Sequence, residues 1–524
     1  MFIARIGNGT STQYAAETVG AKAANLARMA ALGLPIPPAF VLPIELCAAV
    51  VHGCKDARGK VADGLAQGIG FLEQATGRRF GDRRAPLLVS VRSGAARSMP
   101  GMLNTVLNVG CTAGAVHGLV RMTGNPRFAW DCRRRFLESY GSVVLGIDPA
   151  LFAKRHAALA AVDDLDSETL ERLGGEFEGL IEREDETLPD DAMEQLAKAA
   201  EAVYQSWMSE RACTYRKLQR LEDLQGTAVT VQAMVFGNRD RSSGAGVAFS
   251  RDPSTGAAKP MIDFLLESQG EDIVSGNRTP QTEEAIERCA PRAAERLRDI
   301  LRRLEREFAD VQDVEFTIER GELWVLQTRS AKRTPLASLR FAVDLAKESI
   351  ITRPEALRRL DGVNLDGLTR QRLATPDRPV AHGTGASTGV AVGRAAFNLE
   401  HAQRLAGRGD PVILMRPDIS TADVAAFAVS SGIVTAVGGR TAHAALVARQ
   451  MAKPCVVGCA ALTFEPDDHG IARLAGHPIN PDDWISIDGE SGLIFLGRHD
   501  VITERPDAEL SEIDAWRRST SKPE

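Results

Sequence analysis

The sequence has 524 residues, of which 44% are hydrophobic and 25% charged, and its formal net charge is −6 at pH 7. A chain of this length exceeds what one hydrophobic core supports, so we expect a soluble globular protein of roughly two to four domains. The weakly negative charge does not favour a nucleic-acid-binding surface, and no apolar run reaches the roughly 20 residues of a membrane-spanning helix.

The cysteines and the N-terminal residues both predict a cytoplasmic protein. The eight cysteines are scattered without a CxxC pair, which favours reduced thiols over a disulfide framework or a zinc site. The first residues of the chain lack the apolar core of a signal peptide. We therefore expect neither a membrane nor a nucleic acid among the partners.

Two basic residues in the N-terminal part are candidates for phosphate binding. Lys22 lies at a turn-to-helix junction beside Gly20, although the local residues fit an ordinary solvated lysine better. Arg92 ends a predicted strand and is followed by a loop rich in Ser and Gly over residues 93–101. Such a loop can cover a triphosphate, because small residues let the backbone approach closely. The loop matches neither a P-loop nor GxGxxG, which disfavours those two classes.

The pattern is helical from about residue 125 to residue 220, rich in strands over 228–266, and helical again over 283–308. A predicted hairpin follows, in which strand alternation puts Asp313, Glu315 and Thr317 on one face. A three-residue turn centred on Gly321 would place Glu315 opposite Gln327. Acidic groups beside apolar side chains favour a bound cation such as Mg²⁺ with a triphosphate. An ordinary hairpin with a solvated acidic face explains the same pattern.

Residues 330–379 read as a charged helical connector, which ends where prolines and a glycine accumulate. A compact α/β module is expected to follow, over about 380–496. The residues beyond Arg498 are polar, and we expect them to form a short exposed tail.

Inside this module a histidine stands at a predicted helix start. A buried strand over 433–437 and a Gly-Gly turn precede a helix that we expect Thr441 to cap, which puts His443 in the first turn. Backbone N–H groups without helical partners and the helix dipole stabilise an anion there. The first turn holds no second His or Cys at ligand spacing, so a metal site is disfavoured. A covalent phosphate carrier and a structural histidine both remain open.

Taken together, these motifs resemble the pyruvate phosphate dikinase family of phosphoenolpyruvate-utilising enzymes, over about residues 15–497. Residues 438–455 resemble the phosphohistidine segment of that family. Five segments resemble its ATP-grasp nucleotide domain and occur in the family's order, namely 20–26, 90–110, 226–256, 269–281 and 312–334.

The resemblance implies an α/β multidomain fold with an ATP-grasp nucleotide-binding domain followed by a small swivelling phosphohistidine domain. The implied boundaries are 1–335 for the ATP-grasp domain with a helical subdomain at about 112–200, 336–380 for a helical linker, 381–498 for the phosphohistidine domain and 499–524 for a C-terminal tail.

The resemblance also implies a role for each candidate residue. His443 would be the catalytic phosphate carrier, and Lys22 and Arg92 would contact the phosphates of ATP. Glu315 and Gln327 would hold Mg²⁺, with Asp313 assisting. A phosphate-contacting arginine of the family falls on Arg329, and a loop lining the nucleotide cleft falls on residues 269–271.

Three residues depart from the family's pattern. Arg440 stands where Met is common, and Ala442 stands where Ser or Cys is common. We expect Arg440 to alter which surface the histidine loop docks against. Asn104 replaces a usual Asp, which we expect to weaken a hydrogen-bond network behind the Gly-rich loop.

The implied function is that of an ATP-dependent phosphotransferase. His443 would take the β-phosphoryl group of ATP while inorganic phosphate takes the γ-phosphoryl group, a role that water has in the synthase form. The residues after 498 are too few for the ~250-residue (β/α)₈ barrel that binds pyruvate in this family. We therefore expect a separate barrel protein, or another acceptor as in antibiotic phosphotransferases, to take the phosphate. A non-catalytic nucleotide-binding regulator is the alternative from a different class.

Overall fold

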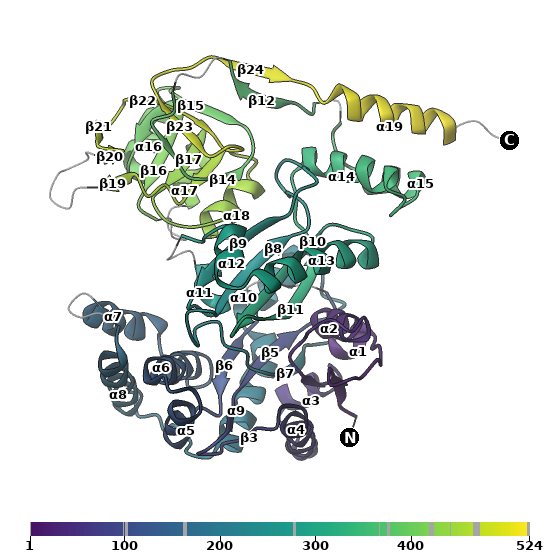
Figure 1. Ribbon diagram of the computed structural model, residues 1–524, viewed down its shortest axis with the longest axis vertical. Helices are drawn as coiled ribbons and strands as arrows, with labels where there is room; N and C mark the ends of the chain where they lie inside the picture. The colour runs from purple at the N-terminus through teal and green to yellow at the C-terminus, as the bar shows by residue number, and fades with distance from the viewer. Residues whose placement is uncertain are drawn as a thin grey trace. The chain divides into compact units, whose positions relative to one another are not determined.

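The computed structural model describes residues 2–97, 99, 103–160, 165–275, 279–365, 367–374, 378–418, 424–440, 442–464 and 472–520 (Figure 1). They form two compact units, which are described separately below. Unit 1 comprises Met1–Asp240, Ile318–Arg320 and Trp324–Thr328, and unit 2 comprises Arg241–Thr317, Gly321–Leu323 and Arg329–Glu524. Several sheets alternate with helices, so the predicted α/β multidomain class is confirmed.

Unit 1 is built on a five-stranded sheet with the strand order β1-β2-β7-β5-β6. Its strands are β1 (Ala4–Ile6), β2 (Ala39–Leu42), β7 (Ala228–Ala233), β5 (Val89–Gly94) and β6 (Thr105–Val109), and neighbours run antiparallel. Every residue of the central strand β7 is buried. Helices α4 (Lys55–Thr76) and α9 (Ala192–Gln205) contact strands of this sheet. The core of unit 1 therefore lies between the sheet and these helices.

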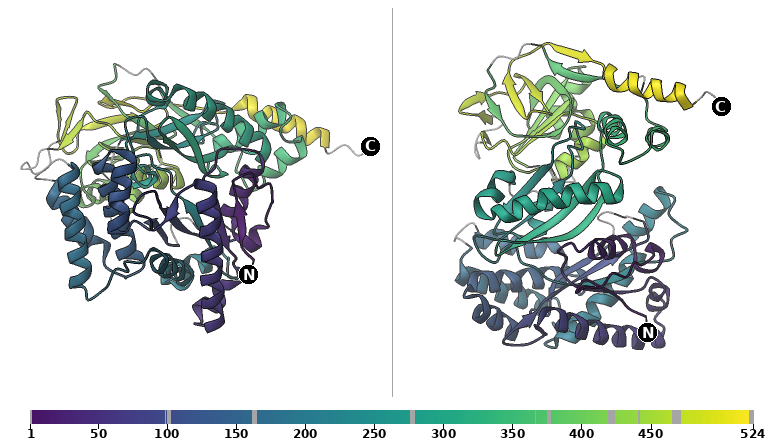
Figure 2. Two further views of the ribbon diagram at one scale, coloured as in Figure 1. Left: turned by 60° about the horizontal axis from the view of Figure 1, so that its bottom comes forward. Right: turned by 45° about the vertical axis from the view of Figure 1, so that its right-hand side comes forward.

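The helices between β6 and β7 form a bundle (Figures 1 and 2). Besides α9 they are α5 (Ala113–Thr123), α6 (Pro126–Val143), α7 (Pro149–Ala160), α8 (Ser167–Arg183) and α10 (Glu210–Leu218). Five of them begin after a residue whose side-chain oxygen accepts from the first turn, namely Thr112, Asn125, Asp166, Asp191 and Ser209. These caps satisfy N–H groups that have no helical partner, so the sequence marks where each helix begins.

Short elements complete unit 1. They are α1 (Ala16–Val19), α2 (Ala21–Ala31), α3 (Leu46–Val51), the strands β3 (Arg79–Phe80) and β4 (Pro86–Leu87), and the 3₁₀ helix η1 (Ser206–Met208).

A four-stranded sheet with the order β11-β10-β8-β9 opens unit 2. Its strands are β8 (Gly244–Phe249), β9 (Met261–Leu266), β10 (Gln312–Glu319) and β11 (Glu322–Ser330), and the helices around them are α11 (Gly270–Ser275), α12 (Glu283–Cys289) and α13 (Pro291–Phe308). The turn between β10 and β11 has two residues, Arg320 at φ 54° and Gly321 at φ 78°. The predicted three-residue turn is therefore wrong. Two left-handed residues make the tight turn whose twist matches a hairpin.

The C-terminal residues of unit 2 pack against the connector. Helix α19 (Asp507–Thr520) contacts α14 (Pro335–Lys347) and α15 (Arg353–Arg359), and Ile513 and Trp516 are 0% and 4% exposed. Strand β24 (Val501–Glu504) pairs with β12 (Arg370–Leu373). The expectation of an exposed tail is therefore corrected for α19, whereas the residues of β24 are exposed as expected. A few apolar residues on one helix face suffice to bury a segment whose overall composition is polar.

The remaining part of unit 2 is an eight-stranded sheet with the order β13-β23-β22-β15-β16-β17-β18-β14. Its strands are β13 (Ala381–His382), β14 (Thr384–Ser387), β15 (Val390–Ala396), β16 (Val412–Arg416), β17 (Gly432–Thr435), β18 (Cys455–Val457), β22 (Trp484–Asp488) and β23 (Leu493–Leu496). The two end strands of this sheet, β13 and β14, are separated in the chain by Gly383 alone.

Strands β15 to β18 of this sheet are parallel, and the helices that connect them pack on it. These helices are α16 (Leu399–Gly407), α17 (Val424–Val429) and α18 (His443–Gln450), and a small separate sheet contains β19 (Leu462–Phe464), β20 (Ala472–Leu474) and β21 (His477–Ile479). None of the helices in the described ranges is both long and apolar enough to span a membrane.

The buried face of α19 gives a first prediction. Trp516 is 4% exposed and lies under the guanidinium of Arg353, whose Cζ is 5.7 Å from the ring centroid. Replacing Trp516 with Ala removes this packing, so we expect α19 to dock less stably by about 3 kcal/mol. Hydrogen exchange of the amides in α19 and α14 measures the change.

The matched control is Val501→Ala, because Val501 is 41% exposed, and exposed substitutions usually change stability by less than about 0.5 kcal/mol. Unchanged exchange in the Trp516→Ala variant would show that α19 is not held by its buried face.

Candidate functional site

A close backbone contact in unit 1 fixes where Lys22 lies. Gly20 precedes α2 with φ 83°, and a Cβ atom at this position would lie 2.2 Å from the carbonyl oxygen of Gly94. The N–H of Ala21 donates to the carbonyl oxygen of Ala95 at 2.9 Å. Only glycine fits such an approach. The start of α2 is thereby held against the end of β5, the strand that carries Arg92.

Lys22 and Arg92 line the same cavity, which has a volume of about 20 Å³ and is enclosed entirely by residues of unit 1. Its lining consists of Lys22, Ala23, Leu26, Arg92, Ser93, Thr230, Gln232, Leu326 and Gln327. The structure thus brings together three residues that the sequence analysis singled out, Lys22, Arg92 and Gln327. Two cationic side chains at one small cavity make it a candidate anion site.

Thr230 and Gln232 are lining residues that the sequence analysis missed. Both lie on β7, where Thr230 pairs with Arg92 and Gln232 pairs with Ser90 on β5. Gln232 donates from Nε2 to the carbonyl oxygen of Pro37 at 3.1 Å, whereas the buried Oγ1 atom of Thr230 has no hydrogen-bond partner among the residues that the structure describes. A buried hydroxyl without a partner is costly unless a ligand satisfies it. The sequence contained a signal for both residues, because they are polar residues at alternate positions of an otherwise apolar strand.

The acidic residues of the predicted site belong to unit 2. Asp313 on β10 is 7% exposed, and its Oδ2 atom accepts from Nε of Arg329 on β11 at 2.8 Å. Burial raises the pKa of the Asp313 carboxyl, and the positive charge of Arg329 acts against this rise. Glu315 is half-buried and Thr317 is 2% exposed. The alternative of a solvated acidic face is therefore wrong for Asp313 and Thr317.

The carboxylates of Asp313 and Glu315 fit a cation that is bound by only a few protein side chains. Within the described part of the chain, the buried Oδ1 atom of Asp313 has no hydrogen-bond partner, and Glu315 is close enough to raise the pKa of Asp313. The ranges that the structure describes hold no cluster of three or more His, Cys, Asp or Glu side chains arranged for a metal ion. Mg²⁺ suits such a place, because it prefers oxygen ligands and keeps waters and substrate phosphates in its shell. The expected pairing of Glu315 with Gln327 rested on a three-residue turn, and it loses that support because the turn has two residues.

Helix α18 begins at His443, so the predicted position of this histidine in a first helical turn is confirmed. The residue before it, Ala442, has the extended conformation of an N-cap at φ −61° and ψ 156° and supplies no side-chain cap. The prediction that Thr441 caps the helix is therefore wrong, and Thr441 itself lies outside the described residues, as does the side chain of His443. A helix start without a side-chain cap leaves its first backbone N–H groups to other acceptors.

The loop at residues 269–271 begins α11 with a local hydrogen bond. The N–H of Gln269 donates to Oδ2 of Asp272 at 2.9 Å, and Gln269 is 4% exposed. The loop is thus held by its own side chains, and its predicted place beside the nucleotide stays a prediction.

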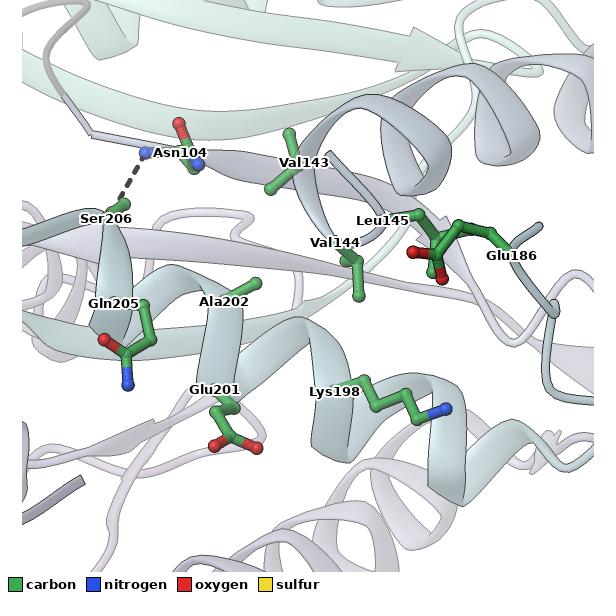
Figure 3. A pocket seen from close by; sticks show the side chains of 10 residues that line it. All are labelled: Asn104, Val143, Val144, Leu145, Glu186, Lys198, Glu201, Ala202, Gln205 and Ser206. Carbon is green, nitrogen blue, oxygen red and sulfur yellow. Dashed lines mark hydrogen bonds between the residues drawn. The ribbon is translucent and has the colours of Figure 1, made fainter. Parts of the chain in front are cut away.

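A larger cavity of about 510 Å³ lies among the helices of unit 1 (Figure 3). It is lined by Asn104, Val143, Val144, Leu145, Glu186, Lys198, Glu201, Ala202, Gln205 and Ser206. Two of its charges are paired along its wall, Lys198 with Glu194 at 3.1 Å and Glu201 with Arg58 at 3.0 Å. None of the predicted phosphate-contacting residues lines it, so we place the candidate site at the smaller cavity.

Asn104 at the edge of this larger cavity has a partner. Its Oδ1 atom accepts from Nη2 of Arg211 at 2.6 Å, and its backbone N–H donates to Oγ of Ser206 at 3.4 Å. The amide therefore makes a charge-assisted hydrogen bond in this protein.

Comparison with known proteins gives two family matches. Residues 57–288 and 283–348 match the family described as pyruvate phosphate dikinase, AMP/ATP-binding domain, which is more than half of the chain. Residues 408–492 match the mobile domain of PEP-utilising enzymes, and this match includes His443.

Curated relatives carry the same name. The chain is 38% identical over 514 residues to pyruvate, phosphate dikinase from Clostridium symbiosum and 40% identical over 526 residues to pyruvate, phosphate dikinase from Rhizobium meliloti. Each alignment covers 95% of this chain and 58% of the relative. The chain thus spans little more than half the length of these relatives. By its nucleotide-binding and mobile domains, this chain belongs to the pyruvate phosphate dikinase family.

Proposed function

We propose that this chain is an ATP-dependent phosphotransferase that phosphorylates its own His443 and passes the phosphoryl group to an acceptor. The observation that carries the proposal is the joint placement of Lys22, Arg92 and Gln327 around one cavity in unit 1. His443 at the start of α18, within the match to the mobile domain, supports the second half of the proposal.

Phosphate binding in this proposal rests on charge. The ammonium of Lys22 and the guanidinium of Arg92 neutralise the polyphosphate of ATP, and the hydroxyl of Thr230 donates a hydrogen bond to it. Arg329 is a further phosphate contact, and Asp313 orients its guanidinium through the 2.8 Å hydrogen bond. Cations and donors placed where charge develops are the main contribution a protein makes to phosphoryl transfer.

Glu315 and Gln327 are the proposed ligands of Mg²⁺, with Asp313 assisting. When bound, the ion would neutralise negative charge on the phosphates. The unpartnered Oδ1 atom of Asp313 supports an added cation near β10, since it would gain a partner there.

The proposed transfer begins with attack by the neutral imidazole of His443 on the β-phosphorus of ATP. A nitrogen–phosphorus bond forms, the bond to the α-phosphate oxygen breaks, and AMP leaves. Inorganic phosphate then accepts the γ-phosphoryl group, which yields pyrophosphate and leaves one phosphoryl group on His443. Backbone N–H groups at the start of α18 stabilise the phosphoryl group, as they do anions at other helix starts.

We propose pyruvate as the acceptor, because the relatives are named pyruvate, phosphate dikinases. Two alternatives belong to the same reaction class. The first is an acceptor other than pyruvate for the phosphoryl group of His443. The second is water, in place of inorganic phosphate, as the acceptor of the γ-phosphoryl group. The phosphorus products distinguish the second of these, since transfer to water yields phosphate instead of pyrophosphate.

The carrier assignment predicts an acid-labile, base-stable phosphohistidine. Incubation with β-labelled ATP, Mg²⁺ and phosphate should label the wild-type protein and leave His443→Ala unlabelled, because the nucleophile is absent. The matched control is His477→Ala, an exposed histidine on β21 of the same unit, which should label normally. Label on the His443→Ala protein would refute the assignment.

The metal assignment predicts that Glu315→Ala or Gln327→Ala reduces the initial rate of labelling by on the order of a hundredfold, because the charge on the phosphates is then poorly neutralised. Chelation of Mg²⁺ should stop labelling of the wild-type protein. Glu322→Ala serves as the control, because Glu322 is an exposed carboxylate at the start of β11. Normal rates in both ligand variants would place the metal elsewhere.

Removal of the hydroxyl of Thr230 should weaken ATP binding without lowering the stability of the ligand-free protein. Thr230→Val keeps the side-chain shape and removes the hydroxyl, so ATP affinity should fall by about tenfold. The stability of the ligand-free protein should not fall, because a buried hydroxyl without a partner is removed. Calorimetric titration with ATP and urea unfolding measure the two quantities. Lys22→Ala and Arg92→Ala should weaken ATP binding more strongly, since each removes a full charge. If Thr230→Val binds ATP normally, its hydroxyl does not contact the nucleotide.

A further inference from the structure

The loop that precedes His443 is bound to strand β9 through Arg440. The backbone N–H of Arg440 donates to Oδ2 of Asp263 at 2.8 Å, and Nη1 of its guanidinium donates to Oδ1 of the same carboxylate at 3.5 Å. Each oxygen of Asp263 is therefore held by a different group of Arg440. Both residues belong to unit 2, Asp263 in the four-stranded sheet and Arg440 in the loop between β17 and α18.

Arg440 is equally well fixed to the domain that carries His443. Its Nε atom donates to the carbonyl oxygen of Gly385 at 3.1 Å, and its own carbonyl oxygen accepts from Nη2 of Arg449 at 2.6 Å. Arg449 lies on α18 and also donates to the carbonyl oxygen of Ala386 at 2.9 Å. Any contact that holds Arg440 therefore also holds the helix that begins at His443.

Backbone packing beside this contact leaves no room for side chains. A Cβ atom on Gly439 would lie 2.4 Å from Cγ of Pro280, and one on Gly458 would lie 2.8 Å from Cγ2 of Thr279. Approaches this close require glycine. The histidine loop and the loop after β18 thus both lie against residues 279–280, which precede α12.

The charges at this contact are complementary and largely shielded from water. Asp263 is 6% exposed, so burial raises the pKa of its carboxyl, and the charge of Arg440 acts against this rise. Burial also lowers the pKa of the Arg449 guanidinium, while the carboxylates of Asp263 and Asp313 act to raise it. A buried carboxylate needs a partner of opposite charge. The histidine-bearing domain supplies that partner only while its loop lies against β9.

We propose that Arg440 and Asp263 form a latch that holds the His443-bearing domain against the sheet of β9 and β10 while His443 is phosphorylated. This inference rests on the proposed function. Arg440 acts as a positioning residue, since its contacts are with protein groups. The guanidinium of Arg440 donates to the carboxylate of Asp263. The latch adds a charge-dependent preference for the docked arrangement, and it must open before the phosphoryl group reaches an acceptor elsewhere.

The test combines Asp263→Ala, Arg440→Met and the double variant. Each single substitution should slow phosphohistidine formation by about tenfold, a typical size for coupling between two surfaces. The double variant should be no slower than the slower single variant, because Asp263→Ala already removes both contacts with Arg440, including the side-chain contact that Arg440→Met removes. ATP affinity should stay unchanged in all three. The control is Glu509→Gln, which removes the charge of Glu509 from its ion pair with Arg340 at 3.0 Å in the same unit, and it should label at the wild-type rate.

Hydrogen exchange of the ligand-free protein tests the latch without any activity. The Arg440 amide should exchange at least tenfold faster in Asp263→Ala than in the wild-type protein, because its acceptor is gone. Equal exchange rates of the Arg440 amide in the two proteins would overturn the latch. So would a double variant whose labelling is slowed by the product of the two single-variant effects. If the wild-type protein takes no label while the Arg440 amide is protected by Asp263, the proposed function fails and the latch stands as a docking contact.

Discussion

The close approach of two backbones at Gly20 and Gly94 is the constraint on which the candidate phosphate site depends. A side chain at position 20 would collide with a carbonyl oxygen at 2.2 Å, and the positive φ of 83° independently favours glycine. Because these two segments touch, the first turn of α2 lies beside the end of β5. Lys22 and Arg92, seventy residues apart in the chain, therefore share one cavity. Two cations placed in this way repel one another, and an anion between them removes the repulsion.

The candidate site residues of unit 2 are mainly acidic, whereas those of unit 1 are mainly cationic. Strand β10 carries Asp313 and Glu315, and Arg329 compensates Asp313 only in part, since one carboxylate oxygen has a partner and the other has none. A protein that keeps a buried acidic oxygen without a partner accepts a stability penalty. Such atoms occur at sites where a bound ligand supplies the missing contact. Their presence here agrees with nucleotide binding in the family.

Helix α18, which begins at His443, is fixed to the eight-stranded sheet. It packs on β14 and β18. Arg449 bonds the loop of Arg440 to β14, so the loop, the helix and the sheet behave as one body. The contacts of Arg440 with Asp263 are few and polar by comparison. Few polar contacts are typical of an interface that forms and breaks, whereas the apolar core of the sheet keeps the domain itself folded.

The sequence by itself determined the family, the α/β class and the helix that starts at His443. It also singled out Lys22, Arg92 and Gln327, three of the residues that line the cavity of unit 1. These follow from local patterns, since motif order, glycine positions and strand alternation are all readable along the chain. Tertiary structure alone decided the two-residue turn at Gly321, the burial of Asp313 and α19, the unpartnered hydroxyl of Thr230 and the pairing of Arg440 with Asp263. Each of these depends on which distant segment covers a residue. A side chain's own sequence neighbours do not specify that contact, because burial and hydrogen bonding are set by packing between elements far apart in the chain.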